Sequence, residues 1–200
     1  MKIKSFIFLA PLFAYLAPLQ AQQAVPREEL LRIAAYVVSL DLKQMLNTPI
    51  PTDPDVKRPV ALREGEHGVM ALPESKVSDG LARQGREIVP VGQLWLRKLV
   101  PQCGSEAARP EKLQIVSLNV GDRTESAVLC ALGVRKNADG KLQLLVYGKS
   151  KEPILELPLK SISAAQDNPI ELSAVVQGDS AVVTLRLLGK HEASFTLVSE

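Results

Sequence analysis

Aromatic residues are few in this 200-residue sequence, and half of them fall within its first 21 positions. The rest of the chain keeps only Tyr36, Trp95, Tyr147 and Phe195. Sugar-binding platforms usually stack their ligands on several exposed aromatic rings. The sequence therefore offers little material for such a platform. A single sugar could still rest on Trp95 if the indole is exposed, whereas a Trp packed in a sheet would leave no such site.

The sequence also lacks the residue spacings that mark catalytic and metal sites. Its only histidines are His67 and His191, which we expect in exposed turns, and no His-x-x-x-His, Cys-x-x-Cys or His-Glu-x-x-His spacing occurs. A Gly-x-Ser-x-Gly elbow and a glycine-rich phosphate loop are absent. Asp122, Asp139 and Asp179 are too dispersed to supply the roughly six to eight oxygens that Ca²⁺ takes. We therefore predict a protein that is not an enzyme and needs no cofactor or metal.

Only two cysteines occur, Cys103 and Cys130. In an oxidising compartment they could form a disulfide, which would close a loop of about 28 residues and stabilise the fold by roughly 3–4 kcal/mol. The alternative is two buried free thiols, since Cys130 lies in the apolar run Ala127–Leu132. The spacing does not decide between them, because the sequence does not define how far apart the two Cα atoms lie.

No hydrophobic run beyond the N-terminus is long enough to span a membrane. The N-terminal run itself is typical of an export signal, because Lys2 and Lys4 precede an apolar stretch and Leu19-Gln20-Ala21 is a suitable cleavage site. An anchor helix is the alternative, although two prolines interrupt the stretch. We predict a signal peptide at residues 1–21 and no transmembrane anchor. The protein should be exported, to the periplasm, the outer surface or the extracellular space.

Neither sign of charge is in excess once this leader is removed. The sequence has 24 Lys and Arg against 22 Asp and Glu, and the leader contains two of the lysines, which leaves 22 of each. The basic residues are scattered in runs of no more than two. Nucleic-acid binding needs a concentrated positive surface, so we do not predict it.

An apolar helix is the first element that the sequence does contain. Pro26-Arg27-Glu28-Glu29 is typical of a helix start, and helically spaced apolar residues predict a helix over residues 27–46. The prolines at 49, 51 and 54 end it and predict an extended linker. Its apolar surface is broader than one stripe and should be covered by the domain itself or by another chain. The candidate interaction surface comprises Leu30, Leu31, Ile33, Val37, Val38, Leu42 and Met45, together with Trp95.

Alternating apolar and polar residues predict strands in the remainder of the chain. The clearest runs are Leu113–Val120, Ala127–Arg135, Leu142–Tyr147, Leu155–Leu159, Ile170–Val176, Ala181–Leu188 and Ala193–Val198. Hairpin turns separate several of them, and Pro158 predicts an edge strand. Ahead of these runs we expect a hairpin over residues 60–72, a strand at Val91–Val100 and a loop at Gln102–Pro110.

These patterns predict a mainly β fold, an antiparallel β-sandwich of jelly-roll or Ig-like type with one N-terminal α-helix. The expected divisions are residues 22–54, holding the helix and the linker, and residues 55–200, holding the sandwich. The hairpins between Ile170 and Phe195, with their Gly-Asp and Gly-Lys turns, resemble laminin-G-like, concanavalin-type domains over less than a sixth of the chain. Pro169-Ile170 replaces the aromatic residue usual in that family. The resemblance implies the architecture and no functional residue.

Three functional hypotheses follow. The first is an exported, non-enzymatic β-sandwich protein that binds or scaffolds other proteins at the cell envelope, through a protein partner or self-association. Its second candidate surface is the outward apolar set Val182, Leu188 and Val198, unless residues 58–112 cover it. The second hypothesis is a carbohydrate-binding module. The third is a small secreted hydrolase with scattered carboxylates such as Glu64 and Glu66, although a turn there predicts solvated charges.

Overall fold

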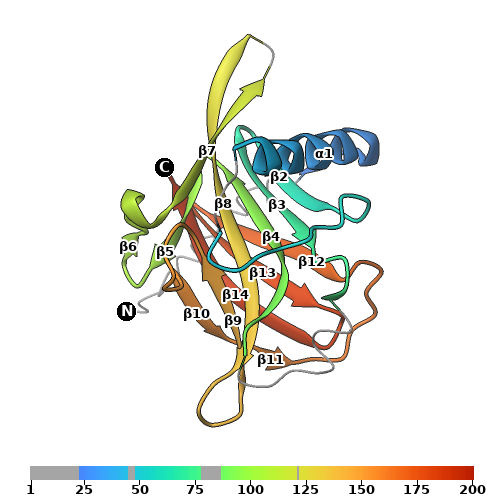
Figure 1. Ribbon diagram of the computed structural model, residues 1–200, viewed down its shortest axis with the longest axis vertical. Helices are drawn as coiled ribbons and strands as arrows, with labels where there is room; N and C mark the ends of the chain where they lie inside the picture. Colours follow the sequence, from blue (N-terminus) through green and yellow to red (C-terminus); the bar gives the residue numbers. More distant parts are fainter. Residues whose placement is uncertain (1–22, 45–47, 78–86, 121) are drawn as a thin grey trace, which may run out of the picture.

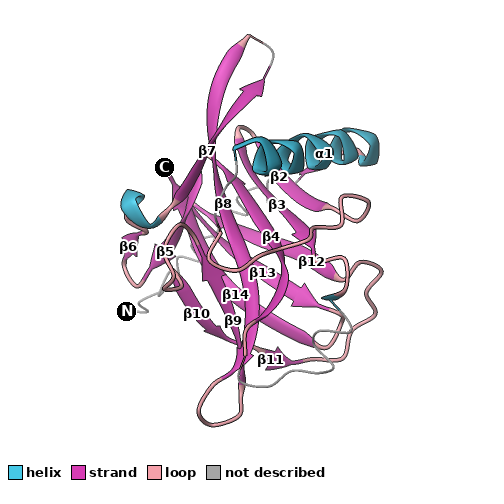
Figure 2. Ribbon diagram, in the orientation of Figure 1, coloured by secondary structure: helices cyan, strands magenta, loops and turns pink. Residues whose placement is uncertain are grey.

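The computed structural model describes residues 23–44, 48–77, 87–120 and 122–200. Two antiparallel sheets pack face to face, and one helix, α1 (Arg27–Gln44), lies across the outer face of the larger sheet (Figures 1 and 2). The predicted β-sandwich with an N-terminal helix is therefore confirmed. The predicted signal peptide at residues 1–21 and Met45 lie outside the described residues.

The larger sheet has eight strands and the smaller has six. In spatial order the larger sheet consists of β1 (Gln23–Ala24), β2 (Val60–Glu64), β3 (His67–Pro73), β4 (Val89–Arg97), β8 (Arg123–Lys136), β9 (Leu142–Tyr147) and β10 (Leu155–Pro158), with β7 (Gln114–Val120) also paired to β8. The smaller sheet consists of β12 (Ile170–Gln177), β13 (Ser180–Leu187), β14 (His191–Ser199), β5 (Leu99–Cys103) and β6 (Glu106–Ala107), with β11 (Lys160–Ser161) also paired to β14. A 3₁₀ turn, η1 (Pro110–Lys112), precedes β7.

The C-terminal hairpins have the register that the alternation predicts. Leu185 on β13 is fully buried between the sheets, whereas Thr184 beside it is not. The turns Gly178-Asp179 and Gly189-Lys190 join β12, β13 and β14 in sequence. Pro158 lies in β10, which is an edge strand as predicted.

The single strand predicted over Val91–Val100 is wrong, because the chain changes sheets within it. Lys98 has a φ of 54° and separates β4 in the larger sheet from β5 in the smaller one. The predicted loop at Gln102–Pro110 is also partly wrong, since it contains the end of β5 and all of β6. A local pattern cannot distinguish one continuous strand from two that join opposite sheets.

Three apolar clusters explain why the central strands are apolar on both faces. Leu94 and Leu96 of β4 pack between the two sheets, while Trp95 between them faces outward toward α1. On β9, Leu145 and Tyr147 face outward and pack against Ile50. The inner core, α1 and the segment around Ile50 together bury both faces of the larger sheet.

The proline-rich segment is attached to the larger sheet by hydrogen bonds. The amide of Asp55 donates to the carbonyl of Pro73 at 2.7 Å, and the amide of Asp53 donates to the Glu74 carboxylate at 2.8 Å. Buried Gln93 donates through Nε2 to the hydroxyl of Thr52 at 2.9 Å. The segment therefore lies along the sheet, while the domain boundary at residue 54 stays a prediction.

Candidate functional site

Contacts at its N-terminus and along one stripe position α1 on the sheet. The guanidinium of Arg27 donates to the carbonyls of Lys57 and Pro59 ahead of β2. One turn apart, Leu30, Ala34 and Val37 are buried against the outer face of the larger sheet. Their spacing is helical, and the chain's own sheet covers this stripe.

The predicted interaction residues therefore divide into buried and accessible ones. Leu30 and Val37 are buried on α1, and Trp95 is 4% exposed on β4 beneath it. Leu31 and Val38 are half-buried, and Ile33 is 39% exposed. Leu42 lies within α1, and Met45 lies outside the described residues.

A groove of about 500 Å³ lies between α1 and the larger sheet. Its apolar lining includes Ile33, Tyr36, Ala61, Met70, Trp95 and Leu118. Ion pairs join Arg63 to Glu29 at 3.3 Å and Arg97 to Glu125 at 2.7 Å, and three of these four residues line the groove. The hydroxyl of Tyr36 accepts a hydrogen bond from the amide of Asn119 on β7, which connects the helix to the β7–β8 hairpin. The groove thus combines an apolar floor with charged sides.

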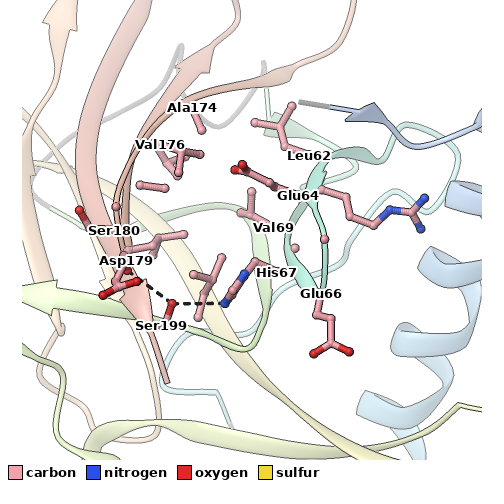
Figure 3. Close-up of a pocket in the computed structure, with 18 residues that line it drawn as sticks. Leu62, Glu64, Glu66, His67, Val69, Ala174, Val176, Asp179, Ser180 and Ser199 are labelled. Carbon is pink, nitrogen blue, oxygen red and sulfur yellow. Dashed lines mark hydrogen bonds between the residues drawn. The ribbon is translucent and has the colours of Figure 1, made fainter. Parts of the chain in front are cut away.

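A second cavity, of about 450 Å³, lies at the edge of the sandwich between the β2–β3 hairpin and the β12–β14 strands. Its lining brings together residues far apart in sequence, including Leu62, Glu64, His67, Val176, Asp179 and Ser199. The Lys98 ammonium beside Glu66 holds the pKa of that carboxyl below its ordinary value. In Figure 3, Glu66 points away from the cavity, whereas Glu64 points toward it.

His67 and Ser199 lie close together in the lining of this cavity. The Nε2 atom of His67 lies 3.2 Å from the Oγ atom of Ser199, a distance suited to a base and a nucleophile (Figure 3). Within the described residues, however, no carboxylate accepts a hydrogen bond from the other ring nitrogen of His67, which a Ser-His-Asp arrangement would require. The pair joins the start of β3 to the end of β14 without the orienting acid of a triad.

Both cysteines are free thiols in the structure, with Cys130 buried and Cys103 half-buried. The Cys103 thiol lies 3.5 Å from the carbonyl of Ile154. Burial raises the pKa of Cys103, and complete burial raises that of Cys130 to about 12. Neither cysteine is an activated nucleophile, because that role requires a lowered pKa.

Neither histidine lies in an exposed turn, since His67 is the half-buried first residue of β3. His191 begins β14 and is half-buried, and its Nδ1 is buried without a hydrogen-bond partner in the described part of the chain. Burial lowers its pKa. The outward apolar set is also partly covered, since Leu188 and Val198 pack against the core between the sheets and Val182 is half-buried.

Sequence reasoning missed both cavities. The groove joins α1 to β2, β4 and β7, and the edge cavity places His67 beside Ser199, 132 positions later in the chain. The local signals were the breadth of the apolar helix and the adjacent charges Glu64 and Glu66. Such signals identify unusual surfaces but not the distant strands that complete them.

Comparisons with known proteins give no relative: no family model, curated protein or solved structure matches the chain. In the ranges described, no three His, Cys, Asp or Glu side chains are grouped so that they could hold a metal ion. Among the described residues, no helix has both the length and the apolar character needed to cross a bilayer.

Proposed function

We propose that this chain is an exported, non-enzymatic β-sandwich protein that binds or scaffolds other proteins at the cell envelope. The observation that carries the proposal is the groove beside α1, with Ile33 39% exposed at its wall. Exposed apolar side chains beside a concave apolar surface are typical of protein contacts. The partner should insert apolar side chains between α1 and β7.

The polar groups around the groove support a protein partner. Two ion pairs, Arg63–Glu29 and Arg97–Glu125, lie around the groove. Within each pair the two charges neutralise each other, and both pairs remain partly exposed. Protein interfaces commonly surround an apolar centre with such a polar rim. The Tyr36–Asn119 hydrogen bond holds the opposite walls in place, so the groove needs little rearrangement to bind.

The aromatic residues give less support to carbohydrate binding. Trp95, Tyr147 and Phe195 are each no more than 5% exposed. Tyr36 is half-buried, and its hydroxyl already accepts a hydrogen bond. A stacking platform needs exposed ring faces, so the sugar hypothesis would have to rely on hydrogen bonding alone.

Site-specific crosslinking in cells that express the full chain tests the proposal. A photoreactive benzoylphenylalanine replaces Ile33 in one strain and Val175 in a second. Val175 is the matched control because it is apolar, 56% exposed and on β12, outside the groove. We expect a discrete crosslinked protein from position 33 and not from position 175.

The crosslinked partner is then purified and its affinity measured for the unmodified chain, Ile33→Asp and Val175→Asp. A loss of about ten-fold or more with Ile33→Asp alone supports the groove. A product of twice the chain's mass identifies the partner as a second copy. Equal crosslinking from both positions contradicts the proposal, as does binding on a glycan array or turnover of ester, peptide or glycoside substrates without any protein partner.

A further inference from the structure

The cavity at the edge of the sandwich shares Leu62, Arg63, His67, Gly68 and Val69 with the lining of the groove, but the rest of its lining comes mostly from the smaller sheet. The proposed protein binding at Ile33 does not use it. Its volume of about 450 Å³ falls in the range of roughly 300–1,000 Å³ usual for small-molecule sites. Its floor consists of core side chains from both sheets, including Val69, Val183 and Leu197, each no more than 5% exposed. This floor is apolar but almost fully covered, so a ligand that enters would contact mainly the walls.

The walls of the cavity are also apolar but open to solvent. Leu62 on β2 and Ala174 on β12 pack against the core and point toward each other across the cavity (Figure 3). Val176 lies at the mouth and is 42% exposed. Its neighbour Val175 lies on the other face of β12 and does not line the cavity.

The charge at the rim is negative. Glu64 lies two residues after Leu62 on the same face of β2, so its carboxylate faces the cavity (Figure 3). Asp179 lies opposite, in the β12–β13 turn. Among the described residues, neither carboxylate has an ion-pair partner, whereas Glu66 is paired with Lys98 and Arg63 with Glu29.

We propose that this cavity binds a small amphiphilic cation, an apolar chain or ring that carries one amino group. The apolar part would be buried against Leu62, Ala174 and Val176, which still expose apolar surface, and this burial supplies the driving force. The ammonium would then lie at the rim, where the carboxylate of Glu64 accepts its hydrogen bonds. An anion of the same shape would meet two unpaired carboxylates and is selected against.

Octylammonium and octanoate are suitable probes because they share a chain and differ in charge. Each is titrated into protein purified after expression of the full chain, and binding is followed by methyl NMR. Octylammonium should shift the methyl signals of Ala174, Val176 and Val183, which line the cavity and not the groove, at saturation, with one molecule bound. The methyls of Ile33 and Met70 in the groove should not move. Octanoate should bind at least ten-fold more weakly.

Two pairs of variants locate the binding. Val176→Trp should cover the mouth and weaken octylammonium binding at least ten-fold, while Val175→Trp should leave it unchanged. Glu64→Gln should weaken it about two- to five-fold, the effect of one partly exposed charge pair. The control Glu111→Gln, an exposed residue of η1, should have no effect.

The unmodified protein alone can overturn the proposal, whether or not the variants fold. Equal affinity for octanoate and octylammonium removes the charge argument. Shifts confined to Ile33 and Met70 move the ligand to the groove, and the absence of any shift at millimolar octylammonium removes the site. Each of these results leaves the proposed protein binding intact, because that is tested at Ile33.

Discussion

Leu185 and Thr184 are adjacent on β13 but have opposite surroundings. Leu185 is fully buried between the sheets, whereas Thr184 is half-buried and its hydroxyl lies 2.8 Å from that of Ser194. Leu185→Ala should lower the free energy of unfolding by about 2–5 kcal/mol, because it leaves a cavity in the core. Thr184→Ala should cost about 0.5–1.5 kcal/mol, the value of one hydrogen bond. Denaturant titrations check both values, and equal costs would contradict this register.

Glu74 makes the attachment of the proline-rich segment sensitive to pH. Burial raises the pKa of its carboxyl above the ordinary value of 4.5. The hydrogen bond from the Asp53 amide lowers this pKa, and the nearby charge of Asp53 raises it, so that the pKa is raised overall. The folded state thus holds this proton more tightly than the unfolded state, so stability falls as the pH rises from 4.5 through the raised pKa. Glu74→Gln removes that loss. The thermal midpoint of Glu74→Gln minus that of the unmodified chain should therefore become larger as the pH rises from 4 to 7.

Asp55, close by in the same segment, should behave in the opposite way. Burial raises its pKa, but hydrogen bonds from Arg58 and the Lys57 amide, together with their charges, lower it below 3.8 overall. It therefore stabilises the fold above pH 3.8, and this contribution is lost as the pH falls through the lowered pKa. Asp55→Asn should thus be most destabilising near neutral pH. A difference independent of pH would contradict the assignment.

At the scale of single elements, Gly92 sets the geometry of β4. The pairing of β4 with β8 shifts between Pro90 and Gly92, and Gly92 has a φ of 151°. A Cβ atom there would lie 2.2 Å from the carbonyl oxygen of Leu72. Gly92→Ala should therefore destabilise the protein by more than about 3 kcal/mol, because it combines backbone strain with a clash against a paired strand.

Gly68→Ala is the control for that substitution. Gly68 lies on the neighbouring strand β3 at an ordinary φ, and an added Cβ would come no closer than 3.8 Å to another atom. Its free energy of unfolding should change by less than about 1 kcal/mol. Similar costs for the two variants in urea denaturation would show that the bulge at Gly92 does not constrain the sheet.

The elements that the sequence predicts well are those with local causes. Alternation and turn residues locate β12, β13 and β14, and Pro26 with its following acids locates the start of α1. At Lys98 the same reasoning fails, because alternation runs on while the chain crosses from one sheet to the other. In the run Leu113–Val120 the alternation changes phase between Ile115 and Val116, which predicts either a bulge or burial on both faces. In the structure β7 pairs regularly with β8, and Ile115 is exposed.

The candidate site is less predictable than the fold, because it depends on which parts of the chain pack over the apolar face of α1. The broad apolar helix correctly indicated that something must pack on it. The sequence could not distinguish a partner from the chain's own sheet, and the structure buries Leu30, Val37 and Trp95 against each other. Ile33 is left 39% exposed beside residues of β2, β4 and β7, and a helical pattern contains no information about which strands lie next to it.

At the scale of the whole molecule, α1 and the segment around Ile50 form a third layer outside the sandwich. They cover Met70, Trp95, Leu129 and Tyr147 on the larger sheet, all of them buried. The sandwich alone would therefore expose a continuous apolar face. This layer also forms one wall of the groove, so the stability of the molecule and its proposed binding surface depend on the same helix.

Deleting residues 22–52 tests the structural role of this layer. The deletion removes Leu30, Ala34, Val37 and Ile50 from buried contacts, at roughly 1.5–3 kcal/mol for each of the larger side chains. That loss is comparable with the roughly 5–15 kcal/mol that stabilises a typical domain, so the truncated chain should unfold or aggregate at room temperature. Light scattering and circular dichroism measure this directly.

Ile33→Asp in the full chain is the companion variant. Ile33 is 39% exposed, so its replacement should change the thermal midpoint by no more than about 2–4 °C, the shift expected for 1 kcal/mol in a domain of this size, while partner binding is lost. A truncated chain that remained a folded monomer with an unchanged midpoint would show that α1 contributes nothing to the core. The helix would then act through its partner alone, and the burial of Leu30 and Val37 would not contribute to stability.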